Sequence, residues 1–149
     1  MKKAVLLLSA IVFSFSLFAQ QQTAAPQQNS DDVIKFSGTV YDFGKIKQNV
    51  PVTHDFSFTN VSKAPLVIES AVASCGCTTP VKPEGAVPKG KDSKITAGFN
   101  AGATGPFNKT ITVKIVGLDT PVQLRITGTV LDADAYAKYE EENKSKAKS

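Results

Sequence analysis

The 149-residue sequence predicts an all-β domain, folded as an antiparallel β-sandwich and flanked by polar ends. Apolar and polar residues alternate with a period of two through most of residues 33–131, which is the pattern of half-buried strands. Clusters of Asn, Gly, Pro and Ser interrupt the alternation and mark turns. Between these residues there is no helical periodicity of useful length, so the crossover helices of a parallel sheet are missing.

The expected strands follow one another at short intervals and fill about 98 residues, a normal size for one sandwich domain. The strand after the turn at residues 47–49 places Val52, His54 and Phe56 on its apolar face. The last two strands form a hairpin through the turn at residues 117–120. The expected strands lie, in order, at residues 36–46 (one or two strands), 52–59, 66–73, 95–99, 111–115 and 122–130.

The first 19 residues have the layout of a cleavable secretory signal. Lys2 and Lys3 form a basic start, and Ala4–Phe18 form an apolar stretch of about 15 residues, shorter than the roughly 20 that a spanning helix needs. Cleavage is expected between Ala19 and Gln20. We therefore expect a periplasmic or secreted protein with no membrane span after cleavage, and a retained membrane anchor is the alternative.

A polar segment flanks the expected sandwich on each side. Residues 20–32 are rich in Gln and poor in apolar side chains, which predicts a disordered tether. The sandwich occupies residues 33–131, and residues 132–149 form a polar tail, either frayed or with a short helix capped by Asp132 or Asp134.

Charge argues against a nucleic-acid partner. Loss of Lys2 and Lys3 with the signal lowers the formal net charge from +4 to +2, because all 13 acidic residues lie in the remainder. Arg125 is the only arginine, whereas nucleic-acid surfaces favour arginine for its planar fork of donors. We expect instead a protein or another cell-envelope component as partner, of unknown identity.

The sequence lacks the residue patterns of an ordinary enzyme. His54 is the only histidine, so any Ser/His/Asp or Cys/His arrangement would have to use it. Its place on an apolar strand face favours a packed residue at the edge of the core. There is no phosphate-binding loop, dinucleotide fingerprint or zinc-protease motif. We expect no catalytic residue and no enzymatic activity.

Cys75-Gly76-Cys77 holds both cysteines and is the main candidate site. In an oxidising compartment the simplest outcome is a disulfide, which requires the chain at Gly76 to bring the two Cα atoms within about 6.8 Å. Its loop is too small to restrict the unfolded chain much, so the bridge would stabilise the fold little. A bridge of this kind would shape the loop after the strand at residues 66–73.

Two alternatives keep the cysteines reduced: a metal site and a dithiol redox pair. Two thiolates on one ion suit Cu(I), so copper is the cofactor of this alternative and no cofactor is expected otherwise. His54 is a poor third ligand: if its strand pairs with the next one through the turn at residues 60–65, it sits opposite about Ala71, roughly 13 Å short of Cys75. No basic side chain near the cysteines in sequence favours redox chemistry.

Five motifs carry a family resemblance: YDFGKI (41–46), FSFTN (56–60), PLVI (65–68), SCGCT (74–78) and GPFNKTI (105–111). They resemble a family of exported bacterial domains of unknown function, which is similar to the abnormal-spindle/hydin type of immunoglobulin-like domain. The resemblance implies an immunoglobulin-like antiparallel β-sandwich of about seven strands and an exported location. It implies no established activity.

Taken together, these features predict a non-catalytic exported binding or assembly module of unknown ligand. The competing function is that of a Cu(I)-binding or dithiol redox protein that acts through Cys75 and Cys77.

Overall fold

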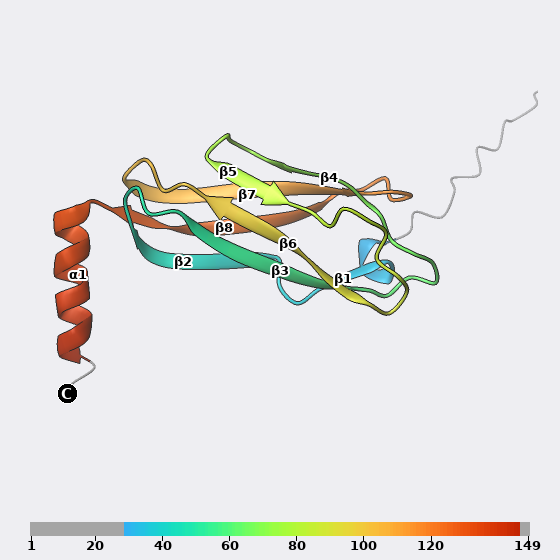
Figure 1. The fold of residues 1–149 in the computed structure, drawn as a ribbon, viewed down its shortest axis with the longest axis horizontal. Helices are drawn as coiled ribbons and strands as arrows, with labels where there is room; N and C mark the ends of the chain where they lie inside the picture. Colours follow the sequence, from blue (N-terminus) through green and yellow to red (C-terminus); the bar gives the residue numbers. More distant parts are fainter. Residues whose placement is uncertain (1–28, 147–149) are drawn as a thin grey trace, which may run out of the picture.

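The computed structural model describes residues 29–146, so the expected signal peptide, its cleavage site and the first part of the expected tether lie outside the described residues. Figure 1 shows two layers of strands with one helix at the C-terminal end. The elements are η1 (Ser30–Asp32), β1 (Ile34–Phe36), β2 (Val40–Lys47), β3 (Val52–Asn60), β4 (Ile68–Ala73), β5 (Thr78–Val81), β6 (Asp92–Phe99), β7 (Gly105–Ile115), β8 (Val122–Leu131) and α1 (Ala133–Lys146).

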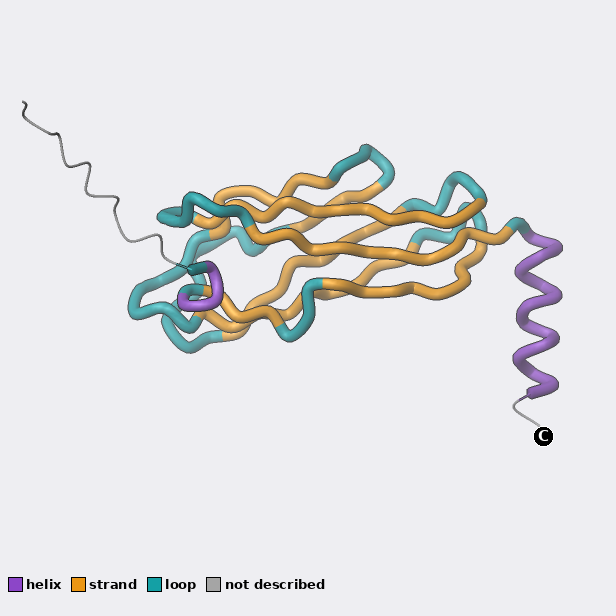
Figure 2. Tube along the Cα trace, turned by 180° about the vertical axis from the view of Figure 1, so that it is seen from behind, coloured by secondary structure: helices purple, strands orange, loops and turns teal. Residues whose placement is uncertain are grey.

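The predicted β-sandwich is confirmed, with eight strands in two four-stranded sheets. Sheet one has the order β1-β3-β6-β5 and sheet two the order β2-β8-β7-β4, and Figure 2 shows the two layers from behind. The hairpin of β7 and β8 is also confirmed. One pairing differs from an all-antiparallel sandwich, since β2 and β8 run parallel. No crossover helix is needed, because the chain between β2 and β8 passes through both sheets before it returns.

The core lies between the sheets and consists of the inward-facing residues of the alternating runs. Phe56 and Phe58 of β3 are almost completely buried, as are Ile111 and Val113 of β7. The outward-facing residues of the same strands are mostly exposed or half-buried. The period-two pattern therefore gave the correct faces of these strands.

The strand that follows β3 does not pair with it. A turn at residues 60–65 would allow a hairpin, but β3 pairs with β1 and β6, and β4 belongs to the other sheet. Asn60 explains the difference. Its side chain is fully buried, accepts hydrogen bonds from the backbone N–H and hydroxyl of Ser62, and donates to the carbonyl oxygens of Ala64 and Val87. These hydrogen bonds stabilise an arch that carries the chain from one sheet to the other.

β2 is an edge strand of sheet two and is irregular at Gly44. Gly44 adopts φ +65° at a β-bulge, its N–H donates to Asp42 Oδ1 at 2.9 Å, and the strand continues to Lys47. Gly128 of β8 packs beneath this bulge. A Cβ at Gly128 would lie 2.8 Å from the Gly44 carbonyl oxygen.

Both ends of the described chain contain short helical elements. Residues 30–32, at the end of the expected tether, form a turn of 3-10 helix. Residues 133–146 form α1, which begins after Asp132, whose Oδ1 accepts the Ala135 N–H at 2.8 Å. Figure 1 shows α1 projecting from the end of the sandwich, and none of its residues is buried. Within residues 29–146, no helix has the length and apolarity to cross a membrane.

Candidate functional site

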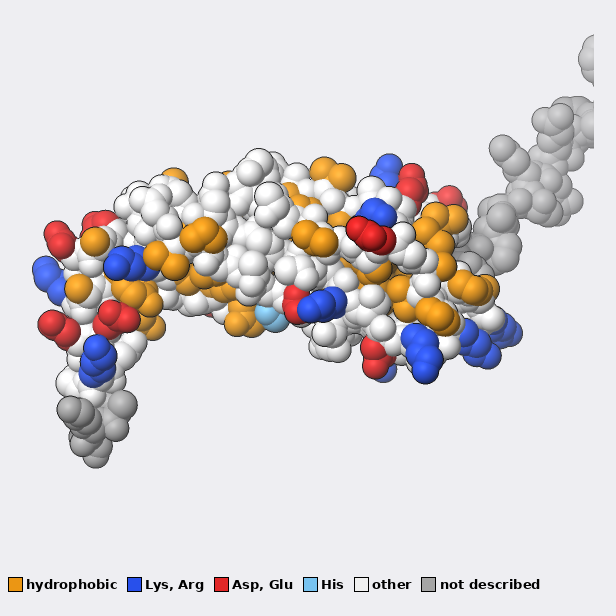
Figure 3. Space-filling view, in the orientation of Figure 1, with side chains coloured by type: hydrophobic (Ala, Val, Ile, Leu, Met, Phe, Trp, Pro, Cys, Tyr) orange, Lys and Arg blue, Asp and Glu red, His pale blue; other side chains and the backbone are white. Residues whose placement is uncertain are grey.

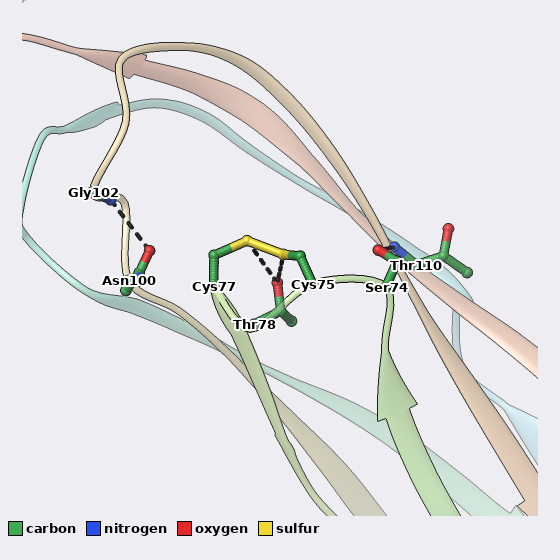
Figure 4. Close-up of a disulfide and its surroundings, with 7 residues drawn as sticks. All are labelled: Ser74, Cys75, Cys77, Thr78, Asn100, Gly102 and Thr110. Carbon is green, nitrogen blue, oxygen red and sulfur yellow. Dashed lines mark hydrogen bonds between the residues drawn. A yellow bond between two sulfur atoms is a disulfide. The ribbon is translucent and has the colours of Figure 1, made fainter.

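Cys75 and Cys77 form a disulfide at the corner where the chain leaves β4 and enters β5. Their Cα atoms lie 5.3 Å apart, within bridging range. The Thr78 N–H donates to the Cys75 carbonyl oxygen at 3.2 Å and closes the turn. Thr78 is buried under the bridge, with its Oγ1 3.7 Å from Cys75 Sγ and 3.9 Å from Cys77 Sγ (Figure 4).

Hydrogen bonds donated by main-chain N–H groups hold this corner to both sheets. On one side, the Ser74 N–H donates to the Thr110 carbonyl oxygen at 2.9 Å, and the Thr110 N–H donates to Ser74 Oγ at 3.2 Å. On the other side, the Asn100 N–H donates to the Cys77 carbonyl oxygen at 3.1 Å. The corner therefore joins the edge strand of sheet two to the edge strand of sheet one.

Gly76 has a smaller role than the sequence suggested. Its φ is not positive, and a Cβ placed on it would meet nothing within 4 Å. The tight approach of Cys75 and Cys77 thus does not depend on glycine, and the residue between them serves as an exposed spacer.

The structure keeps His54 away from the cysteines, although not for the reason we expected. His54 is opposite Ala97 of β6, and Ala97 is opposite Pro80 of β5. Two strand spacings and the offset along β5 place His54 about 14 Å from Cys77. Within residues 29–146, no group of three or more His, Cys, Asp or Glu side chains is arranged to hold a metal ion.

His54 occupies the seam between β3 and β2, where it packs as an edge residue of the core. Its ring stacks on Tyr41 with centroids 3.6 Å apart and meets Phe56 edge-on at 4.8 Å. Burial in this aromatic stack lowers the pKa of His54 below its ordinary value of 6.5, against the smaller opposing effect of Asp55. The expected role as a packed residue is confirmed.

A groove of about 310 Å³ next to His54 contains Ser, His and Asp side chains, but they do not form a catalytic triad. Asp55 follows His54 directly and points to the opposite face of β3. There it accepts hydrogen bonds from Lys94 Nζ at 2.6 Å and from Thr96 Oγ1 at 2.5 Å, and these bonds lower the pKa of Asp55. Among the described residues, no hydrogen bond links His54 to a serine or a carboxylate.

The groove at the opposite end of the sandwich from α1 is larger and more apolar. It measures about 450 Å³ and lies between η1, the arch after β3 and the turn between β7 and β8. Val61 and Val116 expose 43% and 59% of their surface at its rim, and Figure 3 shows hydrophobic side chains gathered at this end. Its titratable lining residues are Asp32 and Lys63, and it contains no cysteine or histidine.

The outer edge of β4, which does not pair with β7, ends at the Cys75–Cys77 corner. Because Ser74 bonds to Thr110, the alternation of an antiparallel pair makes Val72 and Ser70 the next residues bonded to β7. The N–H and C=O groups of Ala71 and Ala73 then point away from β7, toward solvent. Within residues 29–146, the backbone hydrogen bonds include none on this side of either alanine.

The other three edges are protected against pairing. β1 has only three residues, and the stretch of β3 that it leaves uncovered carries the charged Asp55. β5 carries Pro80 at an outward-facing position, where an N–H is missing. β2 is interrupted by the bulge at Gly44 and carries Lys45 and Lys47. β4 also has a bulge, at Glu69, but Ser70–Ala73 are regular and uncharged. β4 is thus the least protected edge, and sequence reasoning could not single it out without the sheet order.

Residues 34–130 match the sequence profile of a family described as "Protein of unknown function (DUF1573)". The chain belongs to this family. The match covers the sandwich of DUF1573 from β1 to β8 and includes the Cys75–Cys77 corner. A comparison of the chain with curated proteins gives no match.

Solved structures show that the DUF1573 sandwich recurs in otherwise different proteins. The ASH/PapD-like domain 7 of human CEP192 has 8% identity and a TM-score of 0.55, and the match covers 87% of this chain and 99% of that domain. A protein of unknown function from Porphyromonas gingivalis W83 has 12% identity and a TM-score of 0.54, and covers 65% of this chain. The secreted serine protease VesC from Vibrio cholerae has 14% identity and a TM-score of 0.55, and covers 70% of this chain.

The chain corresponds to 46% of the Porphyromonas protein and 24% of VesC, so it spans less than half of either. At these identities the similarity establishes the immunoglobulin-like fold of DUF1573 and nothing about activity.

Proposed function

We propose that this DUF1573 protein is an exported, non-catalytic binding module that takes up an extended segment of another polypeptide along the free edge of β4. The observation that carries the proposal is the outward direction of the Ala71 and Ala73 backbone groups in a strand without charge, proline or bulge between Ser70 and Ala73. Main-chain hydrogen bonds to such an edge supply affinity in strand addition, and alternate side chains supply specificity.

The surroundings of β4 favour an apolar segment. Val72 exposes 61% of its surface on the outer face of sheet two, between Ser70 and Ser74. On the inner side, Ala71 and Ala73 are half-buried against the core and leave room for a neighbouring strand. An added strand would therefore place apolar side chains against Val72 on one face and against the two alanines on the other.

The Cys75–Cys77 disulfide supports a binding function over a metal function. A disulfide sulfur is not a thiolate, so the oxidised corner does not offer the thiolate ligands that a Cu(I) site requires. The bridge instead fixes the point at which β4 ends and the chain turns to β5. It also agrees with export, because disulfides persist in oxidising compartments.

Peptide display on phage tests the proposal. Random 12-residue peptides are selected on sparsely immobilised, oxidised protein, and selected peptides are then titrated by calorimetry. We expect enriched peptides with apolar residues at alternate positions. The Ala71→Pro variant should lose their binding, because proline removes an N–H that faces the added strand and takes part in no bond to β7.

The matched control is Val40→Pro on β2, at the opposite edge of the same sheet. The Arg125 N–H donates to the Thr39 carbonyl oxygen, so the Val40 N–H points away from β8, and this variant should leave peptide binding unchanged. Thermal unfolding of Ala71→Pro should remain close to that of the wild type, which separates lost binding from lost folding. The proposal is wrong if no peptide is enriched, or if the selected peptides bind Ala71→Pro as tightly as the wild type.

A further inference from the structure

We infer that the segment which adds to β4 is the β4 strand of a second copy of this chain, so that two sandwiches join into one continuous sheet about a two-fold axis. This inference rests on the proposed function and names its partner. Closed two-fold assemblies are the commonest oligomers, and in them the same surface of each copy must complement itself. The residues of β4 satisfy this condition in one register.

In that register, Val72 lies opposite Val72 of the second copy. Ala71 then pairs with Ala73 of the second copy, and Ala73 with its Ala71. Both alanines have outward-facing N–H and C=O groups, so about four main-chain hydrogen bonds form around the axis. The two Val72 residues become a non-hydrogen-bonded pair with Cα atoms about 4.5 Å apart, a geometry in which apolar side chains pack.

The length of the free edge matches the length of β4 itself. At one end, Leu66 exchanges two backbone hydrogen bonds with Val87, at 2.9 and 2.7 Å, so the edge is already occupied there. At the other end, the chain turns away at Cys75. When Val72 pairs with its copy, Cys75 of one chain falls opposite Glu69 of the other. Each added strand therefore leaves the sheet before it reaches Val87 of the other copy. A longer continuous strand would run on to Val87, where the edge is already occupied.

Charge does not oppose this pairing. Glu69 lies on β4 and Lys114 lies beside it on β7, opposite Ser70. From the strand spacing and rise, each of these residues lies about 20 Å from its own copy, which exceeds the Debye length of about 10 Å at ordinary ionic strength. A single strand pair is a small interface, so we expect a monomer–dimer equilibrium that depends on protein concentration.

Light scattering and sedimentation equilibrium test the inference. The full chain is expressed with its own signal, purified without reductant and measured from low to high micromolar concentration. The wild type should reach the dimer mass. Val72→Lys should remain monomeric, because two like charges would meet about 5 Å apart. Val72→Glu should also be monomeric. An equimolar mixture of the two variants should recover the dimer, because the opposite charges meet only if position 72 of one chain faces position 72 of the other.

Val40→Lys is the matched control, since Val40 is as exposed as Val72 (60% against 61%) but lies on the opposite edge of the same sheet. It should dimerise like the wild type. A wild type that is monomeric throughout overturns the inference, and so does a dimer that Val72→Lys leaves intact. A monomeric wild type whose peptide binding is still lost in Ala71→Pro overturns the inference alone and leaves the proposed function standing.

Discussion

Replacement of Gly128 by alanine tests the parallel pairing of β2 with β8. The new Cβ would lie 2.8 Å from the Gly44 carbonyl oxygen and 2.8 Å from two ring atoms of Phe107, where ordinary contacts are 3.4 to 4 Å. Overpacking of this kind costs about 1 to 3 kcal/mol. The backbone of Gly128 also has φ +157°, which side chains rarely adopt, so we expect a total near the upper end, about 3 kcal/mol.

Thermal unfolding measures this effect. In a domain of this size, 1 kcal/mol shifts the midpoint by about 4 to 8 °C, so Gly128→Ala should lower it by at least about 10 °C. Gly76→Ala is the control, because a Cβ there meets nothing within 4 Å and φ is not positive, and its midpoint should stay within about 2 °C of the wild type. If Gly128→Ala unfolds at the wild-type temperature, β2 does not pack on β8 as described.

Three further predictions concern the corner, the C-terminal helix and the histidine. The Cys75→Ser/Cys77→Ser double variant should fold and lose only about 1 kcal/mol of unfolding free energy in denaturant, because the closed loop is so short. Tight one-to-one Cu(I) uptake by the reduced wild type would instead favour the copper alternative. Deletion of residues 135–149 should lower the thermal midpoint by less than about 5 °C, since α1 has no buried residue, and a larger drop would show that α1 is part of the fold. Stability should fall as pH drops from about 7.5 to 5, because the lowered pKa of His54 means that the unfolded chain binds more protons; His54→Gln should flatten this part of the profile, and an unchanged profile would assign it to other groups.

The sequence was sufficient for the parts of the fold that depend on local pattern. Alternation in β3 and β7 identified the buried faces, and the turn between β7 and β8 identified a hairpin, because each signal lies within a few adjacent residues. The family resemblance then agreed with the sandwich. The cap of α1 at Asp132 was one of two choices for the same local reason.

Pairings between distant strands could not be obtained in this way. The arch at Asn60 resembles a hairpin turn in sequence, and only the contact between its amide and the carbonyl of Val87, 27 residues away, shows that the chain crosses to the other sheet. The same holds for β2 and β8, whose pairing joins the two ends of the domain. The cysteine corner was predicted as a candidate site, but the free edge of β4 depends on sheet order, which local pattern does not encode.

Amide hydrogen exchange at Ala71 and Ala73 tests most directly whether β4 is the binding edge. The account predicts that both amides exchange quickly at low protein concentration, while the neighbouring Val72 amide, bonded to β7, exchanges slowly. At high concentration the Ala71 and Ala73 amides should become protected in the wild type and remain unprotected in Val72→Lys. Rates for Ala71 and Ala73 that are equally slow at every concentration in both proteins would contradict the account, because they would mean that this edge is already closed within a single chain.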